Sequence, residues 1–176
     1  MEIRLARAND IAACLALDHS YESEYVWQVQ THAEVNRIES IFQRSRLPRP
    51  VTVSAVPEGH CLREDWDRQE CFLVADHLGQ MLGYLDLTVQ KRQRAGWVNY
   101  LVVGREYRRH GIGSALMKAS RMWASQHSMR VIFAEIQPKN DPGFQLCQQA
   151  GFHFCGYNEQ LSLNEDIALL FATRLR

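Results

Sequence analysis

The sequence predicts an α+β domain of three layers (α/β/α) around a mixed sheet. Two neighbouring strands that can form a hairpin occupy residues 71–89, and a strand–helix–strand–helix–strand order follows over residues 96–174. The 176 residues have the length of one domain, so we expect residues 1–176 to form a single unit. A hydrophobic content of 46% and a charged content of 23% are those of an ordinary globular protein, and they exclude a disordered or collagenous chain.

The first 70 residues predict a strand, two helices and a charged loop. Residues 1–5 alternate as a short strand does, and Asn9-Asp10 offers a cap for the helix that follows. Apolar residues at helical spacing predict a second helix over residues 35–46. Residues 51–55 alternate as an extended segment, and the charged stretch 57–70 is expected to be a surface loop.

The remainder of the chain predicts six strands and two helices. The strands are expected at residues 71–76, 81–89, 96–103, 130–136, 152–157 and 167–174. One helix begins at Ile112 with an apolar stripe and ends near His127. For the other helix, Asp141 is expected to be the cap, Pro142 the first helical position and Gly151 the residue just past the end.

Charge and cysteine content narrow the class of protein. The 20 Lys and Arg balance the 20 Asp and Glu, so the chain lacks the basic excess of a general nucleic-acid binder. Five cysteines without close pairing favour a reduced, cytoplasmic protein over a disulfide scaffold. The apolar runs are too short for a membrane span, and the first residues lack the apolar core of a signal peptide. We therefore expect neither a nucleic-acid nor a membrane partner.

The most informative stretch is LVVGREYRRHGIGS, residues 101–114, in which a strand leads through cations and glycines into a helix. Free N–H groups in the first helical turn attract an anion, Gly111 and Gly113 let the backbone approach it closely, and Arg108 and Arg109 add charge. The stretch fits a phosphate or pyrophosphate site, or a glycine-initiated helix beside solvated arginines. A dinucleotide fingerprint is disfavoured because Leu116 stands at its third small position, and no Walker Gly-Lys-Ser/Thr occurs.

Two motifs resemble those of the GNAT superfamily of N-acetyltransferases. Arg108-x-x-Gly111-x-Gly113 after a Val-rich strand resembles the acetyl-CoA motif of the family. The pattern Asn140-x-x-Gly143-x-x-Leu146-Cys147-x-x-x-Gly151-Phe152 resembles its second motif, and the start IRLARANDIAACLALD resembles its first strand and helix. The resemblance implies a mostly antiparallel mixed sheet with splayed central strands, about four helices, and acetyl-CoA as co-substrate.

The resemblance also implies where acetyl-CoA binds. Main-chain groups of Leu101, Val102 and Val103 would pair with the pantetheine arm, and one of their N–H groups would face the thioester carbonyl. The residues implied to wrap the pyrophosphate are Arg108, Arg109, His110, Gly111, Ile112, Gly113 and Ser114. Asn140 would hydrogen-bond the cofactor, and the strands at 96–103 and 130–136 would part to admit it.

The catalytic residues depart from the family pattern. Cys147 stands where the family has the tyrosine thought to protonate the leaving thiolate, and Asn99 or Tyr100 stands where it has an acidic residue. Glu135, isolated after the apolar run 131–134, is the candidate base, because desolvation would raise its pKa; otherwise it points to solvent or pairs with an arginine. Tyr100 is the candidate proton donor, or else a packed strand tyrosine. We expect Cys147 to be a core residue.

The stretch SYESEYVW, residues 20–27, gathers aromatic and acidic side chains. It either borders the site of a cationic amine or forms an amphipathic surface helix with buried aromatics. The spacing of His, Cys and carboxylates resembles no metal site, so we expect no metal.

The sequence therefore predicts a cytoplasmic, acetyl-CoA-dependent N-acetyltransferase. Its acceptor would be a primary amine of a small molecule, peptide or protein, and a homodimer is left open. The alternatives are a transferase that uses another acyl-CoA and a non-catalytic regulatory module that binds acyl-CoA.

Overall fold

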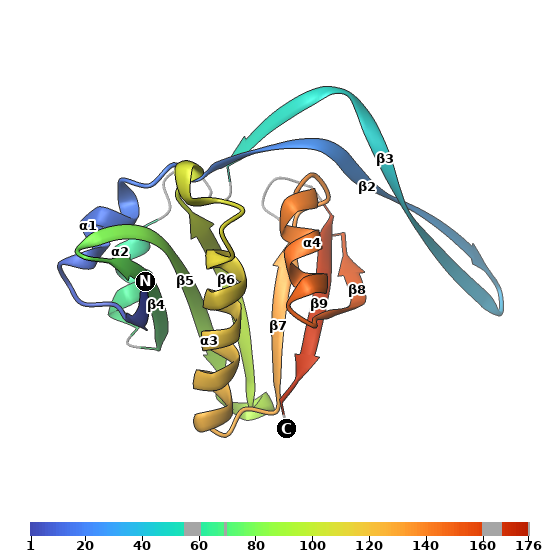
Figure 1. Ribbon diagram of the computed structural model, residues 1–176. Helices are drawn as coiled ribbons and strands as arrows, with labels where there is room; N and C mark the ends of the chain where they lie inside the picture. Colours follow the sequence, from blue (N-terminus) through green and yellow to red (C-terminus); the bar gives the residue numbers. More distant parts are fainter. Residues whose placement is uncertain (55–60, 69, 160–166, 176) are drawn as a thin grey trace.

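The computed structural model describes residues 1–54, 61–68, 70–159 and 167–175. Seven strands in this part of the chain form one sheet in the order β1-β4-β5-β6-β7-β9-β8 (Figure 1). Their bounds are β1 (Glu2–Leu5), β4 (Cys71–His77), β5 (Gln80–Gln90), β6 (Ala95–Val103), β7 (Val131–Ile136), β8 (His153–Asn158) and β9 (Ala168–Arg174). Of the sheet pairings, β6 with β7 is parallel and the others are antiparallel. The predicted mixed, mostly antiparallel sheet is confirmed.

Helices cover both faces of the sheet. On one face, α1 (Asp10–Leu15) and α2 (Leu62–Asp67) pack against β4 and β5. On the other, α3 (Ile112–Gln126) and α4 (Asp141–Gln149) enclose the larger apolar core (Figure 1). Two short 3-10 turns, η1 (Lys91–Gln93) and η2 (Arg105–Tyr107), flank β6. The three layers, and the four α-helices found among the described residues, agree with the predicted fold class.

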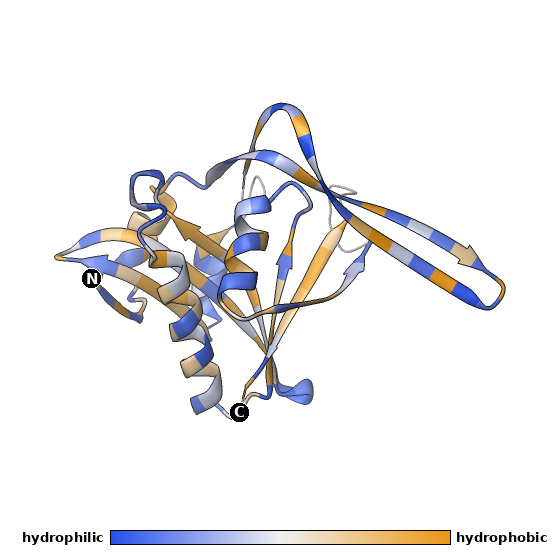
Figure 2. Cartoon of the chain, turned by 45° about the vertical axis from the view of Figure 1, so that its right-hand side comes forward, coloured by the Kyte–Doolittle hydropathy of each residue, from blue (hydrophilic) through white to orange (hydrophobic). Residues whose placement is uncertain are grey.

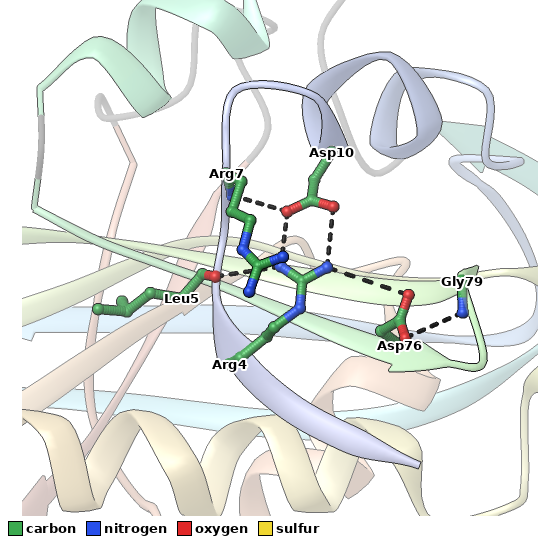
Figure 3. Close-up of polar contacts among 6 residues, drawn as sticks. All are labelled: Arg4, Leu5, Arg7, Asp10, Asp76 and Gly79. Atoms are coloured by element: carbon green, nitrogen blue, oxygen red, sulfur yellow. Dashed lines mark hydrogen bonds and ion pairs between the residues drawn. The ribbon is translucent and has the colours of Figure 1, made fainter.

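The N-terminal strand is fastened to the helix that follows it. Arg4 on β1 donates from both terminal nitrogens to the two carboxylate oxygens of Asp10, at 2.7 and 3.0 Å (Figure 3). The Arg7 N–H donates to the same carboxylate at 2.6 Å, and the Asp76 carboxylate on β4 lies 4.0 Å from the Arg4 guanidinium. The hydrogen bonds from Arg4 hold the pKa of Asp10 below its ordinary value. These contacts fix the edge strand to both α1 and β4.

Two long strands, β2 (Ser20–Glu34) and β3 (Arg37–Ser54), form a hairpin that projects from the body (Figures 1 and 2). The predicted helix over residues 35–46 is wrong, because residues 35 and 36 form the turn of the hairpin and β2 pairs with the segment from Arg37 to Arg46. Alternate β3 side chains contact the body: the Ser40 hydroxyl and the Tyr157 hydroxyl are 3.1 Å apart, and Phe42 packs on Phe154. That spacing of two is the period of a strand.

The predicted charged loop over residues 57–70 contains the short helix α2. The residues of that loop before Cys61, and Ala55 of the predicted extended segment, lie outside the described residues. Leu62 is buried and Trp66, one turn later, is half-buried, so the helix turns an apolar edge toward the sheet. The loop prediction is therefore wrong over Leu62–Asp67, where two apolar residues at a spacing of four outweigh the charge around them.

The two central strands part after four paired residues. Ala95–Val98 of β6 pairs with Val131–Ala134 of β7, and the pairing ends there. Beyond that point β6 stays with β5 as far as Val103, and β7 stays with β9 as far as Ile136. A bulge at Asn99 shifts the β5–β6 register at the same level. The predicted splay is confirmed, and it leaves a strand edge of β6 open beside α3 and α4.

Candidate active site

A cavity of about 620 Å³ lies beside the open edge of β6. Its walls come from the end of β6, the loop after it, the first turns of α3 and α4, and the start of β2. Ten of the residues expected to hold the cofactor line it: Leu101, Val102, Val103, Arg108, Arg109, Gly111, Ile112, Gly113, Ser114 and Asn140. His110 is not among the lining residues. The fold thus brings both sequence motifs to one site, although they are separated by about 30 residues.

The start of α3 gives this cavity its anion-attracting end. Gly111 is the N-cap with φ of 79°, in the left-handed region, and no side chain caps the first turn. A Cβ built on Gly111 would meet no atom within 4 Å, whereas one on Gly113 would lie 3.2 Å from the Leu146 side chain. The first glycine therefore provides the turn, and the second lets α3 approach α4 closely. Free N–H groups at such a helix start favour a phosphate.

Three arginines of the loop have different roles. Arg108 donates from Nε to the Val103 carbonyl at 2.8 Å and from Nη2 to the Asp18 carbonyl at 3.0 Å. Arg105 pairs with Glu22 of β2 at 2.6 Å on the surface. Arg109 has φ of 65° and lines the cavity. Arg108 therefore braces the loop against β6 and the segment before β2, while its charge stays beside the cavity.

The start of α4 differs from the expected capping by one residue. Asn140, not Asp141, is the N-cap, and its side-chain oxygen accepts the Gly143 N–H at 2.8 Å. Asp141 is the first helical residue, and its carboxylate accepts two hydrogen bonds of 2.7 Å from the Arg44 guanidinium on β3. Pro142 consequently takes the second helical position, which also needs no N–H partner. The predicted cap fails because the buried Asp141 is used to bind the hairpin instead.

Residues 20–27 form the first half of β2, so the expected amphipathic helix is wrong. Tyr21 and Glu22 line the cavity, and the Tyr21 hydroxyl donates to Gln137 at 3.0 Å. Trp27 stacks on Phe144 of α4 with ring centroids 4.0 Å apart. The stretch therefore does border the cavity, but as a strand that α4 holds in place. Sequence reasoning missed the α4 lining residues Gln145 and Gln149, which share a helix face one turn apart.

The two candidate catalytic side chains, Glu135 and Tyr100, do not line this cavity. Tyr100 packs with the core on the α1–α2 face. Glu135 is the first residue of β7 beyond the pairing with β6. Its neighbour Ala134 points into the core on the α3–α4 face, and successive strand residues point to opposite faces, so Glu135 faces the same side as Tyr100. Burial raises the pKa of both groups, and the carboxylates of Asp65 and Asp86 raise that of Tyr100 further. The sheet therefore lies between the cavity on one face and these two groups on the other, and the gap between β6 and β7 is the place where the two faces can communicate.

Cys147 lies in the core between α4 and the sheet, as expected, and is 2% exposed. Burial raises the pKa of its thiol to about 12, so the thiol stays protonated at neutral pH. Among the described residues, no group of His, Cys, Asp and Glu is arranged to hold a metal ion. In the same part of the chain, no helix has the length and apolar character that crossing a membrane requires.

Comparisons with known proteins agree with this geometry. A sequence model of the Acetyltransferase (GNAT) family matches residues 35–152. A crystal structure of nourseothricin acetyltransferase superposes with a TM-score of 0.83 at 22% identity, covering 99% of this chain and 98% of that one. A protein assigned as a streptothricin acetyltransferase of Bacillus anthracis, in complex with acetyl coenzyme A, gives 0.81 at 19% identity, with the same coverage. Ribosomal-protein-alanine N-acetyltransferase of Brucella melitensis gives 0.69 at 20% identity, covering 99% and 100%.

The chain belongs to the acetyltransferase (GNAT) family, because the family match spans more than half of it. It is therefore an acetyltransferase. The structural likenesses, all below 25% identity, support the fold. A comparison with curated protein sequences gave no match.

Proposed function

We propose that this protein is an acetyl-CoA-dependent N-acetyltransferase that moves an acetyl group directly from the thioester to a primary amine. One observation carries the proposal: a single cavity extends from the first turn of α3 to the open edge of β6. Its two ends suit a pyrophosphate and an extended amide-bearing arm, respectively. A structural neighbour that holds acetyl coenzyme A supports the same donor. Acetyl-CoA, when bound, supplies an activated acyl group.

The residues present fit this donor. Main-chain groups of Leu101, Val102 and Val103 that point away from β5 have no strand partner in β7. The Val103 carbonyl already accepts from Arg108, and the remaining groups of this edge would bind the pantetheine amides. The α3 start would hold the pyrophosphate, because Gly111 leaves open space where a side chain would stand. His110 follows the left-handed Arg109 and would contribute through the shape of the turn. Asn140, already engaged as a cap, would offer its remaining amide group.

The chemistry also needs an amine that has lost its proton. An alkylamine with a pKa of about 10.4 is only about one part in 10³ neutral near pH 7. Glu135 lies where β6 and β7 part, and its raised pKa brings it closer to the working pH of a general base. The raised pKa of Tyr100 keeps its hydroxyl protonated, so it can donate to the departing thiolate. Glu135 would take the proton and Tyr100 would return one.

Residues 1–176 would act as one catalytic domain, since the main core joins β4, α3 and β9 through Leu73, Leu116 and Phe171. The acceptor class follows only coarsely from the structural neighbours, which include a nourseothricin acetyltransferase, a protein assigned as a streptothricin acetyltransferase and a ribosomal-protein-alanine N-acetyltransferase. We therefore propose a primary amine on a small molecule or on a peptide or protein.

The test is a thiol-release assay of purified protein with acetyl-CoA against a panel of polyamines, aminoglycoside and streptothricin-type antibiotics, amino acids and peptides. Release that depends on both the enzyme and one amine supports the proposal. The same panel with succinyl- and propionyl-CoA identifies a different donor preference. Tight acyl-CoA binding without acceptor-dependent release for any donor would refute the transfer reaction and leave a binding module.

A further inference from the structure

A second cavity, of about 1540 Å³, lies at the end of the sheet opposite the candidate active site. It is lined by later turns of α3, the start of β7 and the end of β9, whereas the first cavity lies at the end of β6, which runs parallel to β7. This is the lower end of the sheet in Figure 1. β8 begins opposite Ala172, so it does not pair with the last residues of β9. A notch therefore opens between α3 and the free edge of β9.

Basic side chains dominate the lining of this notch. Among the described residues that line it, five are Lys, Arg or His and none is Asp or Glu. The five are Lys118, Arg121, Arg130, His153 and Arg174, and in the described part of the chain none of them forms an ion pair with a carboxylate. The whole chain is neutral, with 20 Lys and Arg and 20 Asp and Glu, so charge is separated locally here. This basic notch should attract an anionic ligand.

Two of these arginines are held in place by main-chain carbonyls. Arg121 donates from Nη1 to the Ala150 carbonyl at 3.0 Å, and Arg130 donates from Nε to the Gln93 carbonyl at 2.9 Å. Each bond leaves other N–H groups of the guanidinium available to a ligand. A side chain that is already held loses less rotamer freedom on binding. The negative end of a helix attracts cations within its last turn, but Lys118 and Arg121 come before the last turn of α3, which ends at Gln126.

The rest of the lining favours a peptide over a phosphate-bearing ligand. The Leu175 N–H donates to the Arg130 carbonyl at 2.9 Å, on the β7 side of β9. Because the main-chain groups of successive strand residues point to opposite sides, the N–H and C=O of Arg174 point to the free edge. Met122 is 56% exposed and Phe133 also lines the notch, so apolar surface lies beside the charges. An extended peptide can use both the strand edge and this surface, whereas a phosphate chain would leave the apolar surface uncovered.

We propose that the basic notch docks an extended, acidic peptide segment of a protein partner. Carboxylates of the segment would pair with Lys118 and Arg174, and the held guanidinium groups of Arg121 and Arg130 would bind further carboxylates. One residue of the segment would hydrogen-bond the Arg174 main chain as an added strand does. The notch and the first cavity share no lining residue, so docking leaves the acetyl-CoA site open. Docking is thus independent of the transfer reaction.

The probe is a fluorescein-labelled peptide of about eight residues in which glutamate alternates with valine or leucine, because side chains of an extended strand alternate between its two faces. Fluorescence anisotropy of this peptide, titrated with the full-length protein, should show saturable binding in the micromolar range. Affinity should fall at least about tenfold between about 50 and 300 mM NaCl, since the paired charges are exposed. The same peptide with glutamine in place of each glutamate should bind at least about tenfold more weakly.

The decisive variant reverses two exposed charges of the notch, Lys118→Glu with Arg174→Glu. It should lower peptide affinity at least about tenfold and keep acetyl-CoA affinity within about twofold. Arg49→Glu with Arg63→Glu is the matched control, because it changes the net charge equally at exposed sites outside both cavities, and peptide affinity should stay within about twofold. The milder pair Lys118→Ala with Arg174→Ala covers a reversal that disturbs the fold, and it should lower peptide affinity about three- to tenfold.

NMR spectra locate the bound peptide. Binding should shift the backbone amide resonances of Ala172–Leu175 and slow the exchange of the Arg174 N–H. The proposal is overturned by an absence of saturable binding, by equal affinity for the glutamine peptide, by an equal loss in the control variant, or by shifts confined to other elements. Tighter binding of tripolyphosphate or of a single-stranded RNA oligonucleotide to the same cations would also overturn it, since the notch would then be a phosphate site.

Each of these measurements is made without turnover. A protein that acetylates no amine but binds the acidic peptide at the basic notch would refute the proposed function and leave the docking site standing. An active acetyltransferase that fails to bind the peptide would do the reverse.

Discussion

Replacing Gly111 by alanine tests the proposed phosphate end of the cavity. Gly111 has φ of 79°, and a residue with a Cβ adopts that conformation at a cost of about 1–2 kcal/mol. The added methyl group itself meets no atom within 4 Å, so the free protein suffers backbone strain without a clash. The cost must then appear in one of two measurable quantities.

If the alanine keeps the left-handed conformation, the free energy of unfolding falls by that amount and Tm drops by about 2–8 °C for a chain of this size. If the loop relaxes to another conformation, the strain returns when acetyl-CoA binds, and the affinity falls about 5–30-fold. Calorimetric titration with acetyl-CoA and a thermal melt of the same sample measure both quantities. Any contact between the methyl group and a phosphate adds to the loss of affinity.

Gly79→Ala is the matched control. Gly79 has φ of 86°, its added Cβ also meets no atom within 4 Å, and it lies in the β4–β5 turn away from the cavity. It should lose a similar amount of stability and none of its affinity for acetyl-CoA. A Gly111→Ala variant with both wild-type Tm and wild-type affinity, or an equal loss of affinity in Gly79→Ala, would refute the reasoning.

Three further predictions concern other sites. Glu135→Gln should lower turnover about 10²–10⁴-fold without changing acetyl-CoA affinity. The acid limb of the pH–rate profile should also shift or vanish, because activity falls as pH drops below the raised pKa of a carboxylate base. Steady-state kinetics across pH test this, and wild-type turnover would make Glu135 structural. Cys147→Ala should keep turnover within about tenfold and lower the free energy of unfolding by about 1 kcal/mol, since the thiol is buried in the core. A thousandfold loss of turnover in a folded protein that still binds acetyl-CoA would make Cys147 catalytic. Leu78→Asn should raise the free energy of unfolding by about 0.5–1 kcal/mol. Leu78 is 94% exposed and has φ of 53° before Gly79, and Asn-Gly is the preferred pair in such a turn. An unchanged or lower stability in a denaturant or thermal melt would contradict this.

Local patterns predicted the parts of the fold that carry their own signal. The strands around β6 and the long α3 follow from apolar runs and period, and Gly151 ends α4 with φ of 79° as expected. The β2–β3 hairpin was not predicted, because apolar residues of β3 recur at spacings that also suit a helix. The segment is a strand because it pairs with β2. No local pattern shows that Phe42 packs on Phe154, more than 100 residues away.

The candidate site, too, could be predicted from the sequence only in part. The glycines and arginines of the loop are adjacent in sequence, so their role could be inferred from it. The role of Arg108, by contrast, depends on carbonyls at Val103 and Asp18, and the hydrogen bond from the Asn99 amide to the Asp86 carboxylate joins β6 to β5 across a bulge. Both depend on tertiary contacts that a sequence pattern does not contain.

The parting of β6 and β7 has a consequence for amide hydrogen exchange. Inside a continuous sheet, backbone N–H groups on a central strand exchange slowly, because each is hydrogen-bonded to a neighbouring strand. Those N–H groups of Leu101–Val103 that point toward the gap have no such partner in β7, so they should exchange quickly in a protein whose surrounding core exchanges slowly. A ligand whose own amides complete this edge would slow them again. Protection confined to these few positions would therefore report occupancy of the gap directly, for any acyl-CoA and in the absence of turnover.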